Sequence, residues 1–200
     1  LERWSYGALE DVALRMAEGL RRRGICDGAR LFIRMGNSLD YALMFFAANA
    51  AGAVPIPASS LLTMPEVEWL VAHARPKAMA WDGVLALPPF ANALGPETIS
   101  ALKKAPRGVY AGTGSEDPAY MVYTSGSSGK PKGVLHAQRA IWGRRPMYQG
   151  WLGIGADDVL LHTGAFNWTY TLGVGLFDPF ANSATSVVYT GEKDASVWQR

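Results

Sequence analysis

The chain has 200 residues, 49% of them hydrophobic, and a formal net charge of +2 at pH 7. This length suffices for one or two domains with a sizeable core. The charge offers no basic stripe for nucleic acid, and the absence of a run of about 18 apolar residues argues against a membrane span. The single cysteine, Cys26, excludes an internal disulfide and favours a reducing compartment, so we expect a cytoplasmic protein.

The first part of the chain alternates helical patterns with short apolar runs. Apolar residues at helical spacing predict three helices, which begin at Ser5, Ser38 and Thr63. Glu66 completes a capping box with Thr63. Short apolar runs predict three strands, at 31–33, 53–57 and 77–81. This alternation predicts an α/β fold of layered sheets with flanking helices and parallel strands. Residues 82–117 give no readable element.

Beyond this region, a polar, glycine-rich stretch at 124–133 lies between two apolar runs. Apolar and β-branched residues then predict strands at 158–162 and 183–189. A helix or an apolar bend is predicted between these two strands, at 169–180.

The stretch 124–133 has the composition of an anion-binding loop rather than of a core element. Its glycines allow the backbone to approach a ligand closely, and successive N–H groups in such turns form concavities for anions. Hydroxyls add short donors and lysines add positive charge. Together these groups suit a polyphosphate. The candidate residues are Thr124, Ser125, Gly126, Ser127, Ser128, Gly129, Lys130 and Lys132.

Two other interpretations of this stretch are less favoured. A Gly/Ser-rich segment is often a flexible linker, but a linker does not usually carry Pro-Lys-Gly followed at once by an apolar run. The P-loop of nucleoside triphosphatases needs Gly, four residues, and then Gly-Lys-Ser/Thr. That motif is absent, because Gly126 and Gly129 are too close and Pro131 stands where the Ser/Thr should be.

The sequence from Tyr123 to Gly133 resembles the phosphate-binding loop of the adenylate-forming superfamily, which includes acyl-CoA synthetases, peptide-synthetase adenylation domains and luciferases. The usual loop has threonine where Ser128 stands, a change that keeps the hydroxyl. The resemblance implies that the chain is part of the large N-terminal domain of such a fold. Residues 1–117 would be a portion of its N-terminal β/α subdomain. Residues 118–200 would hold the phosphate-loop hairpin and the start of the acyl-binding subdomain, within one truncated AMP-binding domain.

The same resemblance implies an AMP-forming carboxylic acid–CoA ligase. Such an enzyme activates its acid with ATP as an acyl-adenylate and then transfers the acyl group to CoA, with Mg²⁺ sharing the phosphate charge. Because the loop holds the β- and γ-phosphates in that family, Thr124 and Lys132 are the candidate catalytic residues. The motifs for adenine, ribose and Mg²⁺ and the C-terminal lysine do not occur here, so we expect these 200 residues alone to be inactive. Tyr189-Thr190-Gly191-Glu192 lacks the ribose motif's spacer and is interpreted as a turn.

A second group of residues follows the predicted strand at 158–162. Ligands bind open α/β sheets beyond the carboxyl ends of strands, and aromatic and small residues there suit an apolar slot. Ordinary core packing is the alternative. In the superfamily this position holds the acyl-binding helix, and Tyr170-Thr171-Leu172-Gly173 is similar to the Tyr-Gly-Leu-Gly typical of aryl-CoA ligases. An aromatic acid such as benzoate is favoured, with a short or medium aliphatic acid second. The candidate substrate-binding residues are Phe166, Trp168, Tyr170 and Thr171.

Neither His136 nor His162 has a Cys or a second His at ligand spacing, so no metal-binding residue is predicted. His162 is expected near the acyl slot. Two other functions remain open, an adenylation domain that loads a carrier protein and a non-catalytic nucleotide-binding module. The sequence also leaves a homo-oligomer open.

Overall fold

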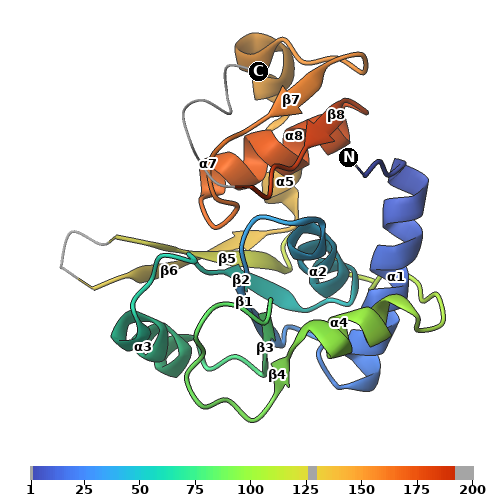
Figure 1. The fold of residues 1–200 in the computed structure, drawn as a ribbon. Helices are drawn as coiled ribbons and strands as arrows, with labels where there is room; N and C mark the ends of the chain where they lie inside the picture. Colours follow the sequence, from blue (N-terminus) through green and yellow to red (C-terminus); the bar gives the residue numbers. More distant parts are fainter. Residues whose placement is uncertain (1, 126–129, 192–200) are drawn as a thin grey trace.

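The computed structural model describes residues 2–125 and 130–191. Its first part is a parallel four-stranded sheet in the order β2-β1-β3-β4, with helices packed around it (Figure 1). The strands are β1 (Arg30–Arg34), β2 (Val54–Pro57), β3 (Ala78–Trp81) and β4 (Ala93–Leu94). The helices are α1 (Tyr6–Arg22), α2 (Leu39–Ala50), α3 (Met64–Ala74) and α4 (Pro96–Lys103). The predicted α/β fold with parallel strands and flanking helices is confirmed.

The three predicted helices begin where the sequence placed their caps. The hydroxyls of Ser5 and Ser38 each accept a hydrogen bond from the backbone N–H three residues on, at 3.2 and 3.1 Å. The carboxylate of Glu66 accepts from the backbone N–H of Thr63 at 2.7 Å and from its hydroxyl at 2.8 Å. Backbone N–H groups at the start of a helix have no acceptor within the helix, and these side chains supply one.

The sheet is covered on both faces because alternate side chains of its strands enter two different apolar clusters. One cluster lies against α1, α2 and α4 and includes the strand residues Leu31, Ile33, Ala78 and Ala80. The other lies against α3 and includes the strand residues Phe32, Ile56 and Met79. Successive side chains of a strand point to opposite faces, and parallel strands are typically buried on both. The result is a layered core with the sheet in its middle.

The region without a readable pattern, 82–117, contains β4 and α4. β4 has two residues, too few to show a period. α4 has eight residues and buries only Ile99 and Leu102. Its signal in the sequence is Pro96 at the first helical turn with Glu97 beside it, a combination that favours a helix start.

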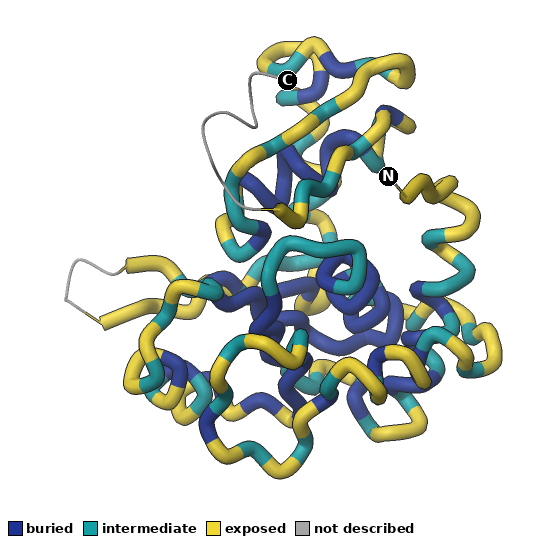
Figure 2. Tube along the Cα trace, in the orientation of Figure 1, coloured by how far each residue is buried: buried dark blue, intermediate teal, exposed yellow. Residues whose placement is uncertain are grey.

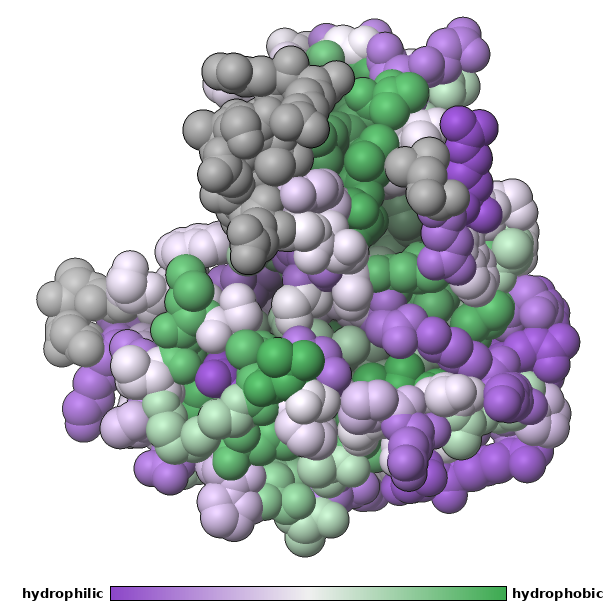
Figure 3. Space-filling model, viewed as in Figure 1, coloured by the Kyte–Doolittle hydropathy of each residue, from purple (hydrophilic) through white to green (hydrophobic). Residues whose placement is uncertain are grey.

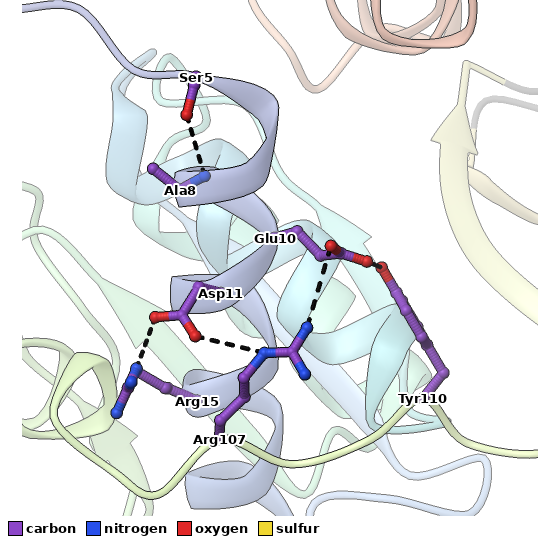
Figure 4. A network of polar contacts seen from close by, with 7 residues as sticks. All are labelled: Ser5, Ala8, Glu10, Asp11, Arg15, Arg107 and Tyr110. Atoms are coloured by element: carbon purple, nitrogen blue, oxygen red, sulfur yellow. Dashed lines mark hydrogen bonds and ion pairs between the residues drawn. The ribbon is translucent and has the colours of Figure 1, made fainter.

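The segment that follows α4 is tied to α1 by a polar network (Figure 4). The guanidinium of Arg107 lies 3.3 Å from the carboxylate of Asp11, and the hydroxyl of Tyr110 donates to Glu10 at 2.7 Å. Partial burial and the neighbouring carboxylate of Glu10 raise the pKa of Tyr110 to about 12. This network fixes the segment after α4 against α1.

The predicted polar stretch connects two antiparallel strands, β5 (Pro118–Thr124) and β6 (Lys132–Ala137). β5 packs beside β2 and enters both apolar clusters, because Tyr120 and Val122 belong to the main core whereas Met121 and Tyr123 pack against the cluster at α3. β6 is exposed from Lys132 to Leu135. Figure 2 shows this exposed hairpin projecting from the buried core.

The last part of the chain is a smaller layer above the sheet in Figure 1. Two parallel strands, β7 (Val159–Leu161) and β8 (Thr185–Val187), pair with each other. Between them run α7 (Thr169–Leu172), the π-helix η2 (Gly173–Phe177) and α8 (Asp178–Ala181), in agreement with the predicted strand–helix–strand order. Before them come α5 (Arg139–Trp142), α6 (Arg145–Met147) and the π-helix η1 (Tyr148–Leu152). Figure 3 shows apolar surface over the upper part of this face, where β7, β8 and α8 lie.

A buried arginine holds the loops at the carboxyl end of β1. Arg34 is 3% exposed and donates to the backbone carbonyls of Ala86, Ser59 and Leu62 at 2.9, 3.0 and 3.1 Å. Burial lowers the pKa of its guanidinium, and the negative charge of nearby Asp82 offsets only part of this effect. The side chain therefore satisfies three carbonyls from two separate loops.

Arg34→Met is expected to lower the free energy of unfolding by about 3 kcal/mol or more. The substitution keeps the apolar stem but leaves three carbonyls without their donor, each at a cost of about 1–3 kcal/mol where water cannot replace it. Urea unfolding of the variant measures this loss. Arg23→Met, at an exposed position beside α1, is the control and should change stability little. Equal stability of the two variants would contradict a structural role for Arg34.

Candidate active site

The candidate phosphate-binding residues lie at the turn end of the β5–β6 hairpin, where β5 finishes and β6 begins. Thr124 and Lys132 are the last cross-strand pair of the ladder, and directly opposite residues have their Cβ atoms about 4.5–5.5 Å apart on one face. Ser125 and Lys130 flank the pair, and all four side chains are exposed. Gly126, Ser127, Ser128 and Gly129 lie outside the described residues. The hairpin thus presents two hydroxyls and two ammonium groups at its turn end.

None of these four side chains is engaged elsewhere in the described part of the chain. The hydrogen bonds and ion pairs of residues 2–125 and 130–191 do not include the side chains of Thr124, Ser125, Lys130 or Lys132. Hydroxyl and ammonium donors near one another attract an anion, since hydrogen bonds to charged acceptors are about twice as strong as neutral ones. The geometry suits a polyphosphate bound at the hairpin.

The four candidate acyl-binding residues divide into two pairs. Phe166 and Thr171 are buried, and the Phe166 ring lies 5.5 Å from that of Tyr41 within the main core. Trp168 and Tyr170 are 60% and 52% exposed. The structure therefore places Trp168 and Tyr170 at the surface of this layer, and Phe166 between it and the sheet.

Thr171 and His162 lie together beside the loop that follows β7. A Cβ atom at Gly164 would collide with the Thr171 hydroxyl and lie 3.0 Å from His162 Nδ1, so both side chains press on the Gly164 backbone. The Gly164 N–H donates to Nδ1 of His162 at 3.0 Å, and the His162 ring meets Tyr170 edge-on at 5.5 Å. His162 is thus adjacent to two of the proposed acyl-binding residues.

Asn37 was not found from the sequence, although it joins the two layers. It follows β1, donates from Nδ2 to the Gly164 carbonyl at 2.7 Å and accepts at Oδ1 from the Phe166 N–H at 3.0 Å. Because more than a hundred residues separate the partners, no local pattern shows the contact. Its one signal was position, since Asn37 follows the carboxyl end of a parallel strand, where ligand sites of α/β sheets lie.

A cavity of about 200 Å³ opens between the two layers at this point, with Asn37, Tyr41, Phe166 and Thr190 among its lining residues. Within the described residues, the buried hydroxyl of Tyr41 has no hydrogen-bond partner, and burial raises its pKa well above the usual value. Thr190 belongs to the segment predicted as a turn, which follows β8 without regular structure up to a bend at Gly191.

A buried ion pair joins the segment after the hairpin to the helical segment that includes α7. The Arg144 guanidinium donates to both carboxylate oxygens of Asp178, at 2.7 and 2.6 Å, and the Asp178 side chain is completely buried. Hydrogen bonding to Asp178 raises the pKa of Arg144. A Cβ atom at Gly173 would overlap this guanidinium, so the glycine makes room for the pair.

Across residues 2–125 and 130–191, no group of three or more His, Cys, Asp or Glu side chains is arranged to hold a metal ion. No helix in that part of the chain is long and apolar enough to cross a membrane.

The layered parallel sheet and the hairpin with its hydroxyls and lysines agree with the adenylate-forming class that the loop sequence resembles. The chain belongs to the AMP-binding enzyme family, whose model matches residues 1–200. The resemblance seen in the loop sequence is confirmed, and it extends over the whole chain.

Individual relatives include a 4-hydroxybenzoate–CoA/benzoate–CoA ligase of Rhodopseudomonas palustris (strain ATCC BAA-98 / CGA009), 30% identical over 92% of this chain and 38% of that protein. The crystal structure of a benzoate CoA ligase from Burkholderia xenovorans LB400 superposes with a TM-score of 0.89 at 27% identity, over 98% of this chain and 42% of that one. A probable non-canonical nonribosomal peptide synthetase of Salinispora arenicola (strain CNS-205) is 35% identical over 66% of this chain and 2% of that protein. The chain thus spans less than half the length of these relatives.

Proposed function

We propose that the chain is part of an AMP-forming acid–CoA ligase that activates an aromatic acid such as benzoate with ATP. The observation that carries the proposal is the Thr124–Lys132 pair, exposed at the turn end of the hairpin with no side-chain partner in the described residues. The benzoate–CoA ligases among the relatives support the choice of acid and of CoA.

The proposed chemistry has two steps. A carboxylate oxygen of the acid attacks the α-phosphorus of ATP, the bond to the bridging oxygen breaks, and pyrophosphate leaves. The thiolate of CoA then attacks the acyl carbon and AMP leaves. No general base is needed for the first step, because the attacking carboxylate is already ionised.

In this proposal the chain's own contribution to the first step is electrostatic. The Thr124 hydroxyl and the Lys132 ammonium donate to the phosphate oxygens on which negative charge grows as pyrophosphate leaves. Ser125, Lys130 and the loop residues from Gly126 to Gly129 would complete the cradle. Mg²⁺, when bound, would share the same charge, and its ligands would come from outside these residues.

We further propose that residues 1–117 and 118–200 are two portions of one AMP-binding domain. Side chains of both portions meet in one apolar cluster, in which Tyr120 and Phe177 pack against Phe45 of α2. Neither portion has a separate core of comparable size among the described residues. This shared packing supports a single folding unit.

The decisive experiment is ATP–pyrophosphate exchange by the full-length protein. Benzoate, 4-hydroxybenzoate and short and medium aliphatic acids are compared as substrates, followed by acyl transfer to CoA. Acid-dependent exchange with preference for an aromatic acid supports the proposal. Exchange with aliphatic acids alone refutes the choice of acid, and nucleotide binding without exchange for any acid indicates a non-catalytic module.

The second candidate is an adenylation domain that loads a carrier protein. The similarity to the peptide synthetase favours it, since that relative matches 66% of this chain at 35% identity. The distinction is made by the acceptor. Acid-dependent exchange without transfer to CoA, together with thioester formation on a carrier domain, favours this alternative.

Thr171→Gly in the full-length protein is expected to widen acid specificity toward bulkier aromatic rings, with the KM for ATP unchanged. Thr171 is buried against the loop at Gly164, so its removal enlarges the space beside Tyr170. The measurement is kcat/KM for benzoate and for ring-substituted benzoates. Thr169→Gly, on the same short helix, is the control for loss of helix propensity. Equal effects of Thr171→Gly on acid and ATP would assign the residue to the core.

A further inference from the structure

Three aromatic side chains meet beside the hairpin, one residue before Thr124, on the side that faces α3. Nδ1 of His73 lies 2.7 Å from the hydroxyl of Tyr123. The Trp69 ring stacks on His73, with centroids 5.1 Å apart and planes at 11°. Tyr123 meets both rings nearly at right angles, at 5.7 Å from His73 and 6.5 Å from Trp69. Neither the loop sequence nor the proposed chemistry accounts for this cluster.

The local sequence builds the cluster from two directions. Trp69 and His73 are four residues apart on α3, so they lie on the same face one turn apart. Tyr123 points to that face because β5 alternates, with Val122 and Thr124 on the other side. Gly133 lies opposite Tyr123, and a Cβ atom there would come within 2.9 Å of Met121 Sδ and 3.4 Å of Tyr123 Cζ, so a larger residue would crowd Met121 on this face.

The contact is placed where it can control the phosphate-binding pair. Tyr123 directly precedes Thr124, and Gly133 directly follows Lys132, so the Tyr123–Gly133 pair is the rung below Thr124–Lys132. β6 is exposed from Lys132 to Leu135, so that strand offers little support of its own. In the described part of the chain, the bond to His73 is the hydrogen bond from another element that reaches the hairpin closest to Thr124.

We propose that His73 and Tyr123, with Trp69 behind them, are positioning residues for nucleotide binding, and that α3 acts through them to fix the direction of the Thr124–Lys132 pair. This rests on the proposed function, because it requires that the pair bind phosphate. The hydrogen bond is the directional contact of the cluster, because a hydrogen bond depends on the positions of its donor and acceptor more strictly than a ring contact does. Displacement of a binding group by about 1 Å is enough to lower a rate substantially.

The test uses the full-length protein, with kinetic constants for ATP and for the acid measured by pyrophosphate exchange. His73→Phe keeps a ring on Trp69 and removes the hydrogen bond, and Tyr123→Phe removes only the hydroxyl. Each is expected to lower kcat/KM for ATP about three- to tenfold, as for loss of one hydrogen bond, with the KM for the acid unchanged. Because both substitutions remove the same hydrogen bond, their effects should not add. The double variant should have about the same kcat/KM for ATP as the single variant with the lower value.

His73→Asn should keep most of the kcat/KM for ATP that His73→Phe loses, because the asparagine side chain has polar groups near the position of Nδ1. Glu68→Gln, an exposed position on the same helix, is the matched control and should leave both constants unchanged. The melting temperature and the dissociation constant for ATP, measured by calorimetry, give readouts independent of turnover. A weaker affinity for ATP at an unchanged melting temperature is the expected result.

Three outcomes overturn the inference. Wild-type constants in an active protein carrying Tyr123→Phe overturn the positioning role and leave the proposed function intact. Equal losses for ATP and acid, or a fall in melting temperature that accounts for the loss, assign the cluster to stability alone. A full-length protein that neither exchanges pyrophosphate nor binds ATP overturns both proposals together.

Discussion

Lys132→Ala in the full-length protein is expected to lower adenylation about tenfold to over a hundredfold while the melting temperature stays nearly unchanged. A charge-assisted contact of about 1.5–3 kcal/mol corresponds to this range of rates. Lys132 is exposed, and its ammonium has no partner in the described residues, so the folded chain does not depend on it. The loss should appear in kcat/KM for ATP, because the interaction is made to phosphate.

The control is Lys104→Ala, which removes an exposed lysine just beyond α4 and changes the net charge by the same amount. It separates a local contact from the general attraction of a positive surface for ATP. Lys132→Arg keeps the charge but changes its shape and reach, so partial activity is expected. A normal rate with a collapsed melting temperature in Lys132→Ala would show that the hairpin end is structural.

The sequence predicted those parts of the fold that depend on neighbouring residues. The starts of α1, α2 and α3 follow from capping side chains a few residues from the helix they begin, and β1 and β3 follow from short buried runs. The parallel order of these strands follows from their alternation with helices. β4 and α4 were missed because a two-residue strand and a helix with two buried side chains leave too little periodicity.

The candidate site likewise has a part that depends on neighbouring residues and a part that depends on distant ones. The candidate phosphate-binding residues form one continuous stretch, so composition alone predicted their chemistry. The polar contacts around the candidate site come from distant parts of the chain: His73 contacts Tyr123, and Asn37 contacts the loop at Gly164. Such contacts are set by the packing of whole layers, and a single sequence does not show which residues will meet, although the position of Asn37 after a parallel strand was a hint. Supporting residues are therefore what the structure adds to the motif.

The buried pair of Arg144 and Asp178 is the clearest example, and its disruption is expected to lower stability strongly. Asp178→Ala is expected to lower the free energy of unfolding by about 3–5 kcal/mol, because it leaves a largely buried guanidinium without its counter-charge. Arg144 cannot relieve this by losing its proton, since arginine stays charged in proteins. Urea unfolding at neutral pH measures the loss.

A second variant separates the pair's charge from its packing. Replacing both residues, with Arg144→Met and Asp178→Leu together, removes both charges, and substitution of a buried pair by apolar side chains of similar volume is often neutral. The double variant should therefore be more stable than Asp178→Ala alone, and Asp157→Asn, at an exposed position, should equal the wild type. If the double variant is no more stable than the single one, the pair contributes shape at Gly173 rather than charge neutralisation.

The same variants also test the proposed acyl-binding residues, because the pair joins the chain after the hairpin to the segment with Tyr170 and Thr171. Loss of the pair should raise the KM for the acid more than the KM for ATP.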